Sequence, residues 1–131
     1  MPISIAYWCV LIAAALPYVW TVIAKSKGER YDNREPRAWL ARQTDPRIQR
    51  ANAAQMNAFE AFPAFAAGVI VAHLSGVPEE RISLLAIVFV LARVLHGALY
   101  VAGFPRARSL SWLVGVVCVF ALLMQAALAA A

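Results

Sequence analysis

The sequence predicts an all-α integral membrane protein, a four-helix bundle that crosses the bilayer four times. Hydrophobic residues make up 63% of the 131 positions, and charged residues only 15%. A soluble domain of this length cannot bury so much apolar surface, because small globules leave much of their surface in water. Four apolar runs have the length of about 20 residues that a spanning helix needs. None of them alternates strictly between apolar and polar residues, which makes strands a poor alternative.

Each run is expected to form one helix of a single transmembrane domain, residues 1–131. The first and fourth runs contain no charged residue, whereas the second and third contain a few. The first run has no Lys or Arg before Lys25, so the basic start of a cleaved signal peptide is missing. We expect the helices at residues 3–24, 51–75, 82–103 and 110–131.

The basic residues predict the orientation of these helices. Of the 12 Lys and Arg residues, eight lie in the first loop, residues 25–50, and Arg106 and Arg108 lie in the third. The second loop, residues 76–81, has one Arg against two Glu. The positive-inside rule therefore places the first and third loops in the cytoplasm and both termini on the opposite side. A nucleic-acid partner is disfavoured, because acidic residues are interspersed among the basic ones.

Several other features have simple expectations. Residues 35–43, with a proline in the first turn and Trp39 between arginines, predict a short interfacial helix. Trp20 lies near the end of its run, where interfacial aromatic residues are common. Cys9 and Cys118 lack metal-ligand spacing and are expected to be reduced packing residues. No HExxH, CxxC or glycine-rich phosphate loop occurs, so metal and nucleotide chemistry have no support.

Polar residues inside the second and third runs are the functional signal, because ionisable groups in a span usually face a partner or a cavity. On a helix, the polar residues of each run share one face, within arcs of about 80° and 60°. Glu60 and Arg93 both lie roughly 14 Å below the cytoplasmic boundary at about 1.5 Å per residue. The two faces therefore predict one polar, cytoplasm-facing site, formed by Arg50, Asn57, Glu60, Arg93, His96 and Tyr100.

A purely structural interpretation stands beside this one. Glu60 and Arg93 could form an ion pair, with Asn57 and His96 hydrogen-bonded between helices. Pro63 is expected to kink the second helix, which could open the site or be ordinary membrane-helix plasticity. His73 stands alone near the far end of that helix, where a snorkelling or hydrogen-bonded histidine is expected.

Two stretches resemble the MAPEG family, the membrane-associated proteins of eicosanoid and glutathione metabolism. They read RANAAQMNAFEAFPAF, residues 50–65, and ARVLHGALYVAGFPRARS, residues 92–109. The Asn-x-x-Glu-x-x-Pro core is fairly specific, and the Arg-x-x-His-x-x-x-Tyr of the third run supports it. The resemblance, to a bacterial type of member, implies a homotrimer in the bacterial inner membrane that binds glutathione between subunits near the cytoplasmic face.

The resemblance also implies roles for particular residues. Glutathione would be the co-substrate, and a lipophilic small molecule would reach it from the membrane lipids. Many members have an arginine four residues before the motif Asn, where this chain has Ala53, and Arg50 could substitute for it. The residues at the family's glutathione-contact positions are Asn57, Glu60, Arg93, His96 and Tyr100. The family's catalytic positions correspond to Arg108 and Ser109, and Tyr100 is a further candidate to stabilise the thiolate.

Three hypotheses follow. The leading one is a membrane-embedded, glutathione-dependent transferase or peroxidase that acts on lipophilic electrophiles or hydroperoxides. The second is a non-catalytic scaffold of the same family that binds lipids or partners. The third is a small proton-coupled multidrug transporter, which is disfavoured because such transporters carry their essential carboxylate in the first helix, and here Glu60 is in the second.

Overall fold

The computed structural model describes all residues, 1–131, as five helices without a strand. Four of the helices are long and apolar enough to cross a membrane, in agreement with the predicted all-α class. The short helix expected in the first loop is also present. The helices are α1 (Ser4–Lys25), α2 (Pro36–Arg42), α3 (Pro46–Leu74), α4 (Glu79–Ala102) and α5 (Pro105–Ala129).

Three helices begin earlier than their apolar runs, and α4 does so by three residues, at Glu79 rather than at residue 82. α3 begins at Pro46 rather than at residue 51, and α5 begins at Pro105 rather than at residue 110. Proline suits the first turn of a helix because its ring fixes the backbone angle φ near the helical value. The N–H group that proline lacks would have no hydrogen-bond partner in the first turn. Asp45 additionally caps α3 by accepting the backbone N–H of Arg47 at 2.9 Å. Hydropathy therefore located the spans but not the polar turns that precede them.

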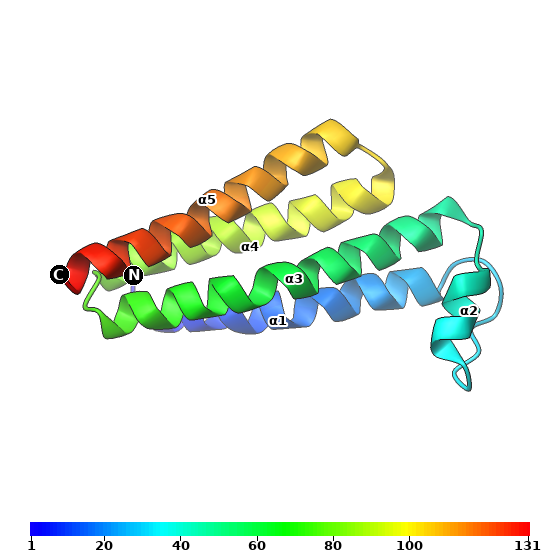
Figure 1. Ribbon diagram of the computed structural model, residues 1–131, viewed down its shortest axis with the longest axis horizontal. Helices are drawn as coiled ribbons and strands as arrows, with labels where there is room; N and C mark the ends of the chain where they lie inside the picture. Colours follow the sequence, from blue (N-terminus) through cyan, green and yellow to red (C-terminus); the bar gives the residue numbers. More distant parts are fainter.

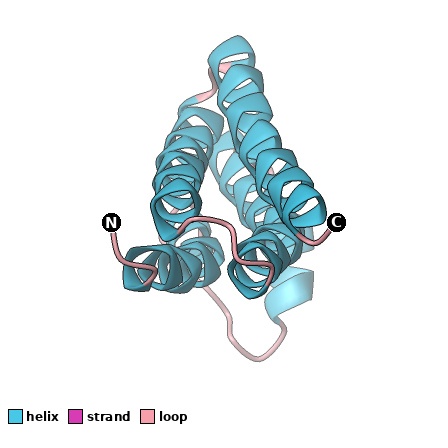
Figure 2. Ribbon diagram, turned by 90° about the vertical axis from the view of Figure 1, so that its left-hand side faces the viewer, coloured by secondary structure: helices cyan, strands magenta, loops and turns pink.

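The long helices pack as two pairs. α4 packs most extensively against α5 and α1 against α3, and α3 also contacts α4 and α5. Both termini lie at one end of the bundle and α2 lies at the other (Figure 1). The end-on view in Figure 2 shows the four long helices side by side around a common centre. At the end with the termini, Tyr7 Oη and His73 Nδ1 share a hydrogen bond of 2.5 Å, as expected of a hydrogen-bonded histidine.

Aromatic and small residues fix the spacing of the helices. Phe65 of α3 and Phe89 of α4 stack with ring centroids 3.9 Å apart. Trp20, near the end of α1, is only 6% exposed and packs inside the bundle. Its ring lies on Gly97, where a Cβ atom would come within 2.0 Å of Trp20 Cζ2. The missing side chain at Gly97 thus lets α1 approach α4.

Other expectations for single residues can be compared directly. Cys9 and Cys118 are free and buried, as predicted. α3 continues as a helix through Pro63.

The outer surface of the chain remains strongly apolar, with exposed large side chains such as Trp8, Leu74 and Phe120. Such a surface fits contact with lipid or with further protein rather than with water.

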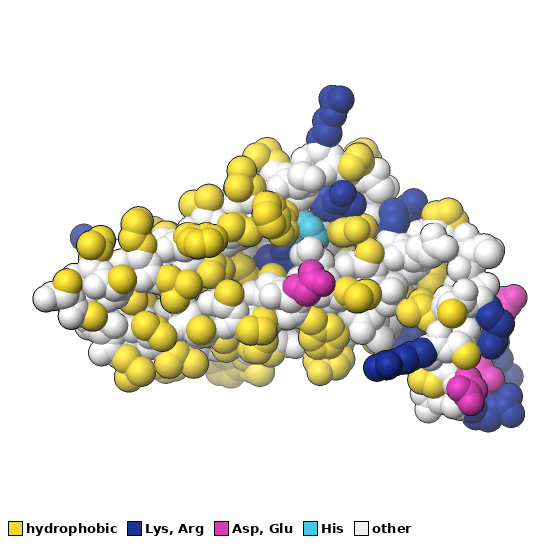
Figure 3. All heavy atoms as spheres, in the orientation of Figure 1, with side chains coloured by type: hydrophobic (Ala, Val, Ile, Leu, Met, Phe, Trp, Pro, Cys, Tyr) yellow, Lys and Arg dark blue, Asp and Glu magenta, His cyan; other side chains and the backbone are white.

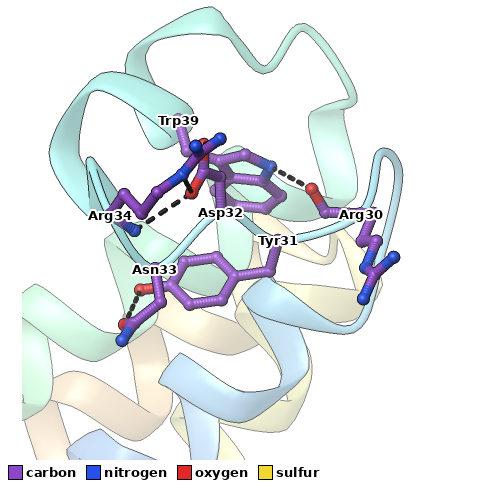
Figure 4. Close-up of polar contacts among 6 residues, drawn as sticks. All are labelled: Arg30, Tyr31, Asp32, Asn33, Arg34 and Trp39. Carbon is purple, nitrogen blue, oxygen red and sulfur yellow. Dashed lines mark hydrogen bonds and ion pairs between the residues drawn. The ribbon is translucent and has the colours of Figure 1, made fainter.

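The first loop is folded against the ends of α1 and α3 (Figure 4). Trp39 of α2 is 2% exposed, and its Nε1–H donates to the carbonyl of Arg30 at 3.0 Å. Arg34 and Asp32 form an ion pair at 3.1 Å within the same loop. Burial of Trp39 with Ala24 and residues of α3 anchors α2 to the bundle. The loop is therefore a structured cover at this end of the bundle.

Candidate functional site

Polar side chains gather on one otherwise hydrophobic face of the bundle. In Figure 3, acidic, histidine and arginine side chains interrupt the apolar surface near the middle of the molecule, over α3, α4 and α5. Two adjoining cavities lie on this face, and both include Asn57 and Trp112 in their walls. The face therefore combines residues from three helices that are far apart in the sequence.

Arg93 is the central buried charge of this face. Its side chain is 4% exposed, and its Nη2 donates to Asn57 Oδ1 at 2.6 Å. The stem of the side chain passes over Gly115, where a Cβ atom would lie 3.4 Å from Arg93 Cδ. A buried guanidinium needs hydrogen-bond acceptors, and within the chain Asn57 supplies the only one. The remaining donors of Arg93 are available to a ligand.

Glu60 lies beside Arg93 but is not paired with it. The ion pairs of the chain are Arg34–Asp32 and Arg47–Asp45, both outside this face. Glu60 is exposed, although it lies in a segment apolar enough to span the membrane. The alternative of a structural Glu60–Arg93 ion pair is therefore not realised within the chain. Glu60 lies within electrostatic reach of Arg93 but makes no direct ion pair with it.

The first cavity has a polar edge and an apolar wall. Its volume is about 220 Å³, and Asn57, Glu60 and Arg93 form the polar edge. A molecule in this cavity would therefore contact charged groups at one end and hydrocarbon at the other. The apolar wall consists of Ala61, Ala64, Phe89, Trp112, Gly115, Val116, Val119 and Phe120.

The second cavity adjoins the first and has a volume of about 210 Å³. The guanidinium of Arg108 lies over the ring of Tyr100, with Cζ 4.2 Å from the ring centroid. The ring of His96 meets that of Tyr100 edge to face, with centroids 5.7 Å apart. The structure thus brings the three predicted catalytic residues, Arg108, Ser109 and Tyr100, into the wall of one cavity. The other residues of this wall are Asn57, His96 and Trp112.

His96 carries an unsatisfied polar atom. The side chain is 3% exposed, and its Nδ1 has no hydrogen-bond partner. Buried polar atoms in native proteins nearly always have a partner, so an exception requires an explanation. The ring also lies in the wall of the second cavity, and packing within the chain leaves this nitrogen without a partner.

Arg50 lies apart from this group. Its Nε donates to the carbonyl of Val101 at 3.1 Å, and its guanidinium lies next to Gly103. Gly103 ends α4 with a φ of 84°, a conformation that suits glycine. Arg50 therefore ties the start of α3 to the end of α4, and it is in the wall of neither cavity.

The apolar walls were not predicted from the sequence. Phe89, Trp112 and Val116 sit in uniformly hydrophobic runs, where no pattern separates a cavity wall from a lipid-facing side chain. The only available signal was helical spacing, since Trp112 follows Arg108 by four residues and Val116 follows Trp112 by four. That spacing continues one face of α5 from the polar residues into the bilayer.

Comparison with known proteins identifies a family. The sequence model of one family, described as the MAPEG family, matches residues 5–128. No curated protein and no solved structure matches the chain. The matched range includes every residue of the two cavities and all four long helices except the first residue of α1 and the last of α5.

Proposed function

The chain belongs to the MAPEG family and is an integral, multi-pass membrane protein, and from this premise we propose that it is a glutathione-dependent transferase or peroxidase. Its substrates are lipophilic electrophiles or hydroperoxides. The observation that carries the proposal is the unpaired Glu60 beside the buried Arg93, at the edge of a cavity that adjoins Arg108 and Tyr100.

The charges of this face suit glutathione, which has two carboxylates, one ammonium group and a thiol. Glu60 pairs with the ammonium group, which removes the cost of an unpaired carboxylate in the bilayer. Arg93 binds a carboxylate with the donors that Asn57 leaves free, since guanidinium and carboxylate match in geometry. His96 supplies a further hydrogen bond from the adjoining cavity.

In this proposal, the thiol of glutathione reacts in the second cavity. A free thiol has a pKa of about 8.5, and a nearby guanidinium lowers that pKa and raises the thiolate fraction. Arg108 and the Tyr100 hydroxyl stabilise the thiolate, and Ser109 lies within the same wall. In conjugation, the sulfur forms a bond to an electrophilic carbon and the leaving group departs with its electron pair. In peroxide reduction, the sulfur attacks the peroxide oxygen, the O–O bond breaks, and an alcohol leaves after protonation. The thiol of a second glutathione then attacks the sulfenic acid, which gives a disulfide and releases water.

The lipophilic substrate occupies the apolar wall of the first cavity. Phe89, Val116 and Phe120 offer hydrocarbon contacts, and Trp112 separates them from the second cavity. Phe120 is 68% exposed, so this wall continues into the lipid-facing surface of α5. A substrate dissolved in the membrane can therefore reach the thiolate without crossing water.

We propose that the molecule is a homotrimer in the bacterial inner membrane, with the first and third loops in the cytoplasm. The open, partly charged face fits an interface where a neighbouring copy covers glutathione. The excess of Lys and Arg in the first and third loops supports the orientation.

Activity measurements with a matched pair of arginine variants test the proposal. Purified protein should conjugate chlorodinitrobenzene or reduce cumene hydroperoxide with glutathione. Arg108→Leu should lower kcat by about 10²–10³-fold, the usual effect of removing a charge-stabilising group. Arg106→Leu, which removes an exposed arginine outside both cavities, should leave kcat unchanged. Absence of both reactions above background in the unmodified protein would contradict the proposal.

A non-catalytic lipid-binding scaffold is the second candidate. It is favoured by Ala53, where many members have an arginine, and by the use of Arg50 to bind the end of α4 instead. In that case the purified protein would bind a fatty acid or phospholipid in its apolar cavity and show no thiol chemistry. Measuring lipid binding and glutathione turnover on one preparation separates the two candidates.

A further inference from the structure

The carboxyl end of α4 needs a hydrogen-bond partner from outside the helix. The last carbonyls of a helix have no partner within it and carry a partial negative charge, which favours a nearby cation. The N–H groups of Gly103 and Phe104 satisfy the carbonyl of Leu99. The carbonyl of Val101 cannot be satisfied in this way, because the residue four positions later is Pro105, which has no N–H. The last turn of α4 also contains no basic residue.

Arg50 of α3 supplies both the donor and the charge. Its Nε donates to the carbonyl of Val101 at 3.1 Å. The side chain is half-buried and pairs with no carboxylate, since both ion pairs of the chain involve other arginines. Basic side chains near a helix end commonly bond its last carbonyls and interact favourably with its dipole. Arg50 is therefore a cap for α4 that comes from another helix.

The same arginine lies against the turn from α4 to α5. Only Gly103, with a φ of 84°, and Phe104 separate the two helices. A Cβ atom at Gly103 would lie 3.6 Å from Arg50 Cζ. Val101 also packs through its side chain against buried residues of α1, α2 and α3. The end of α4 is thus held at Val101 by its side chain and by its carbonyl.

Two of the groups proposed to stabilise the thiolate stand on either side of this turn. Tyr100 precedes Gly103 by three residues, and Arg108 follows it by five. The N–H of Arg108 donates to the carbonyl of Phe104 at 3.0 Å, so the turn also sets where Arg108 begins. The contact of the Arg108 guanidinium with the Tyr100 ring, 4.2 Å from Cζ to the centroid, joins the two sides. A change in the turn would therefore move the guanidinium away from the ring.

We propose that Arg50 is a positioning residue, which caps α4, fixes the turn and thereby holds Arg108 over Tyr100. This role rests on the proposed glutathione chemistry and adds to it a residue that touches neither the thiol nor the lipophilic substrate. Arg50 is in the wall of neither cavity. The rate of the reaction should therefore depend on Arg50, whereas the affinity for glutathione should not.

Turnover measured over a range of pH tests this role. Arg50→Met removes the cap and should lower kcat near neutral pH by about tenfold, because displacing Arg108 raises the pKa of the bound thiol by about one unit. The deficit should shrink once the pH exceeds that pKa, and the calorimetric Kd for glutathione should be unchanged. Arg50→Lys keeps a cation that can bond the last carbonyls and should retain most of kcat. Arg47→Met, at the start of the same helix but paired with Asp45, is the matched control and should leave kcat unchanged.

Thermal unfolding in detergent tests the same role without turnover. Arg108→Leu removes the contact with Tyr100 and should lower Tm in the unmodified protein. In the Arg50→Met background the same change should lower Tm much less, because the contact is already lost. Such non-additivity measures coupling between residues. If the unmodified protein turned over no glutathione, the proposed function would fail, whereas this cycle would still decide whether Arg50 holds the pair.

Three results would overturn the positioning role. A weakened glutathione affinity with unchanged kcat in Arg50→Met would make Arg50 a ligand instead. A kcat deficit of equal size at every pH would indicate a general loss of structure. Equal Tm losses from Arg108→Leu in both backgrounds would show that Arg50 does not hold the pair. If Arg50→Met does not fold, as judged by helical circular dichroism, the uncharged Arg50→Gln takes its place in both measurements.

Discussion

At the scale of single residues, the hydrogen bond between Asn57 and Arg93 determines the geometry of the site. The sequence placed both residues on facing polar surfaces, with Arg93 at the depth of Glu60 and an ion pair between those two as one of two interpretations. The long arginine side chain instead reaches Asn57 and leaves Glu60 unpaired. Helical geometry gives the depth of a backbone position but not the reach of a flexible side chain, so the true partner could not be predicted.

The Asn57–Arg93 bond predicts an unusual order of stabilities. Asn57→Ala leaves the buried guanidinium without its acceptor and should lower the free energy of unfolding by about 1.5–3 kcal/mol. Arg93→Met removes the charge and keeps an unbranched apolar side chain. The double variant should therefore be more stable than Asn57→Ala alone. Thermal unfolding in detergent measures this order, and a double variant less stable than either single one would contradict it.

Asp45 predicts a pH-dependent contribution to stability. Side-chain and backbone hydrogen bonds from Arg47 hold the pKa of the Asp45 carboxyl below its usual value. A lowered folded-state pKa stabilises the fold above the unfolded-state pKa of about 3.9 and loses that effect as the pH falls through the folded-state value. Asp45→Ala should therefore lower Tm near neutral pH and not at about pH 2. A Tm difference that persists unchanged in acid would refute this explanation.

At the scale of helices, α5 has two functional faces that its composition does not distinguish. Val116 lines the first cavity, whereas the next residue, Val117, is 58% exposed on another side of the helix. Both belong to one uncharged apolar run. The sequence predicted the spans and the loop helix because hydropathy and helix-start signals are local. It could not separate cavity walls from lipid-facing residues, because that depends on the rotation of α5 against α3 and α4.

The neighbouring valines offer a matched test of the cavity. Val116→Phe fills part of the cavity and should raise KM for a bulky lipophilic electrophile by about tenfold, corresponding to about 1.4 kcal/mol of lost binding. The affinity for glutathione should be retained, since the polar edge is unchanged. Val117→Phe adds the same ring on the outer surface and should leave both constants unaltered. Equal effects of the two substitutions on KM would show that the cavity does not bind the substrate.

The contact between Trp20 and Gly97 shows another limit of prediction at this scale. A position near a helix end predicts an interfacial tryptophan, but it does not predict that the ring fills the space that Gly97 leaves between α1 and α4. Glycine in an apolar run signals close packing in general. It does not identify the partner, because the partner comes from another helix.

At the scale of the whole molecule, the distribution of basic residues determines the proposed orientation. Labelling of single introduced cysteines tests it, with little background because Cys9 and Cys118 are buried. In intact bacterial cells, a membrane-impermeant maleimide should label Glu80→Cys in the first turn of α4, next to the second loop, and should not label Lys27→Cys in the first loop. Permeabilised cells provide the control, since both positions should then react. The opposite pattern in intact cells would reverse the proposed orientation.

We propose that the polar face binds glutathione, with Glu60 as the partner of its ammonium group. Calorimetric titration of glutathione into purified protein measures this directly, alongside Glu60→Gln and the control Glu80→Gln at the far end of the bundle. We predict saturable binding that Glu60→Gln weakens by about tenfold or more, because a charge-assisted hydrogen bond contributes about 1.5–3 kcal/mol. Glu80→Gln should bind like the unmodified protein. Absence of saturable binding would contradict glutathione binding by this face, and an unchanged affinity in Glu60→Gln would contradict the role of Glu60.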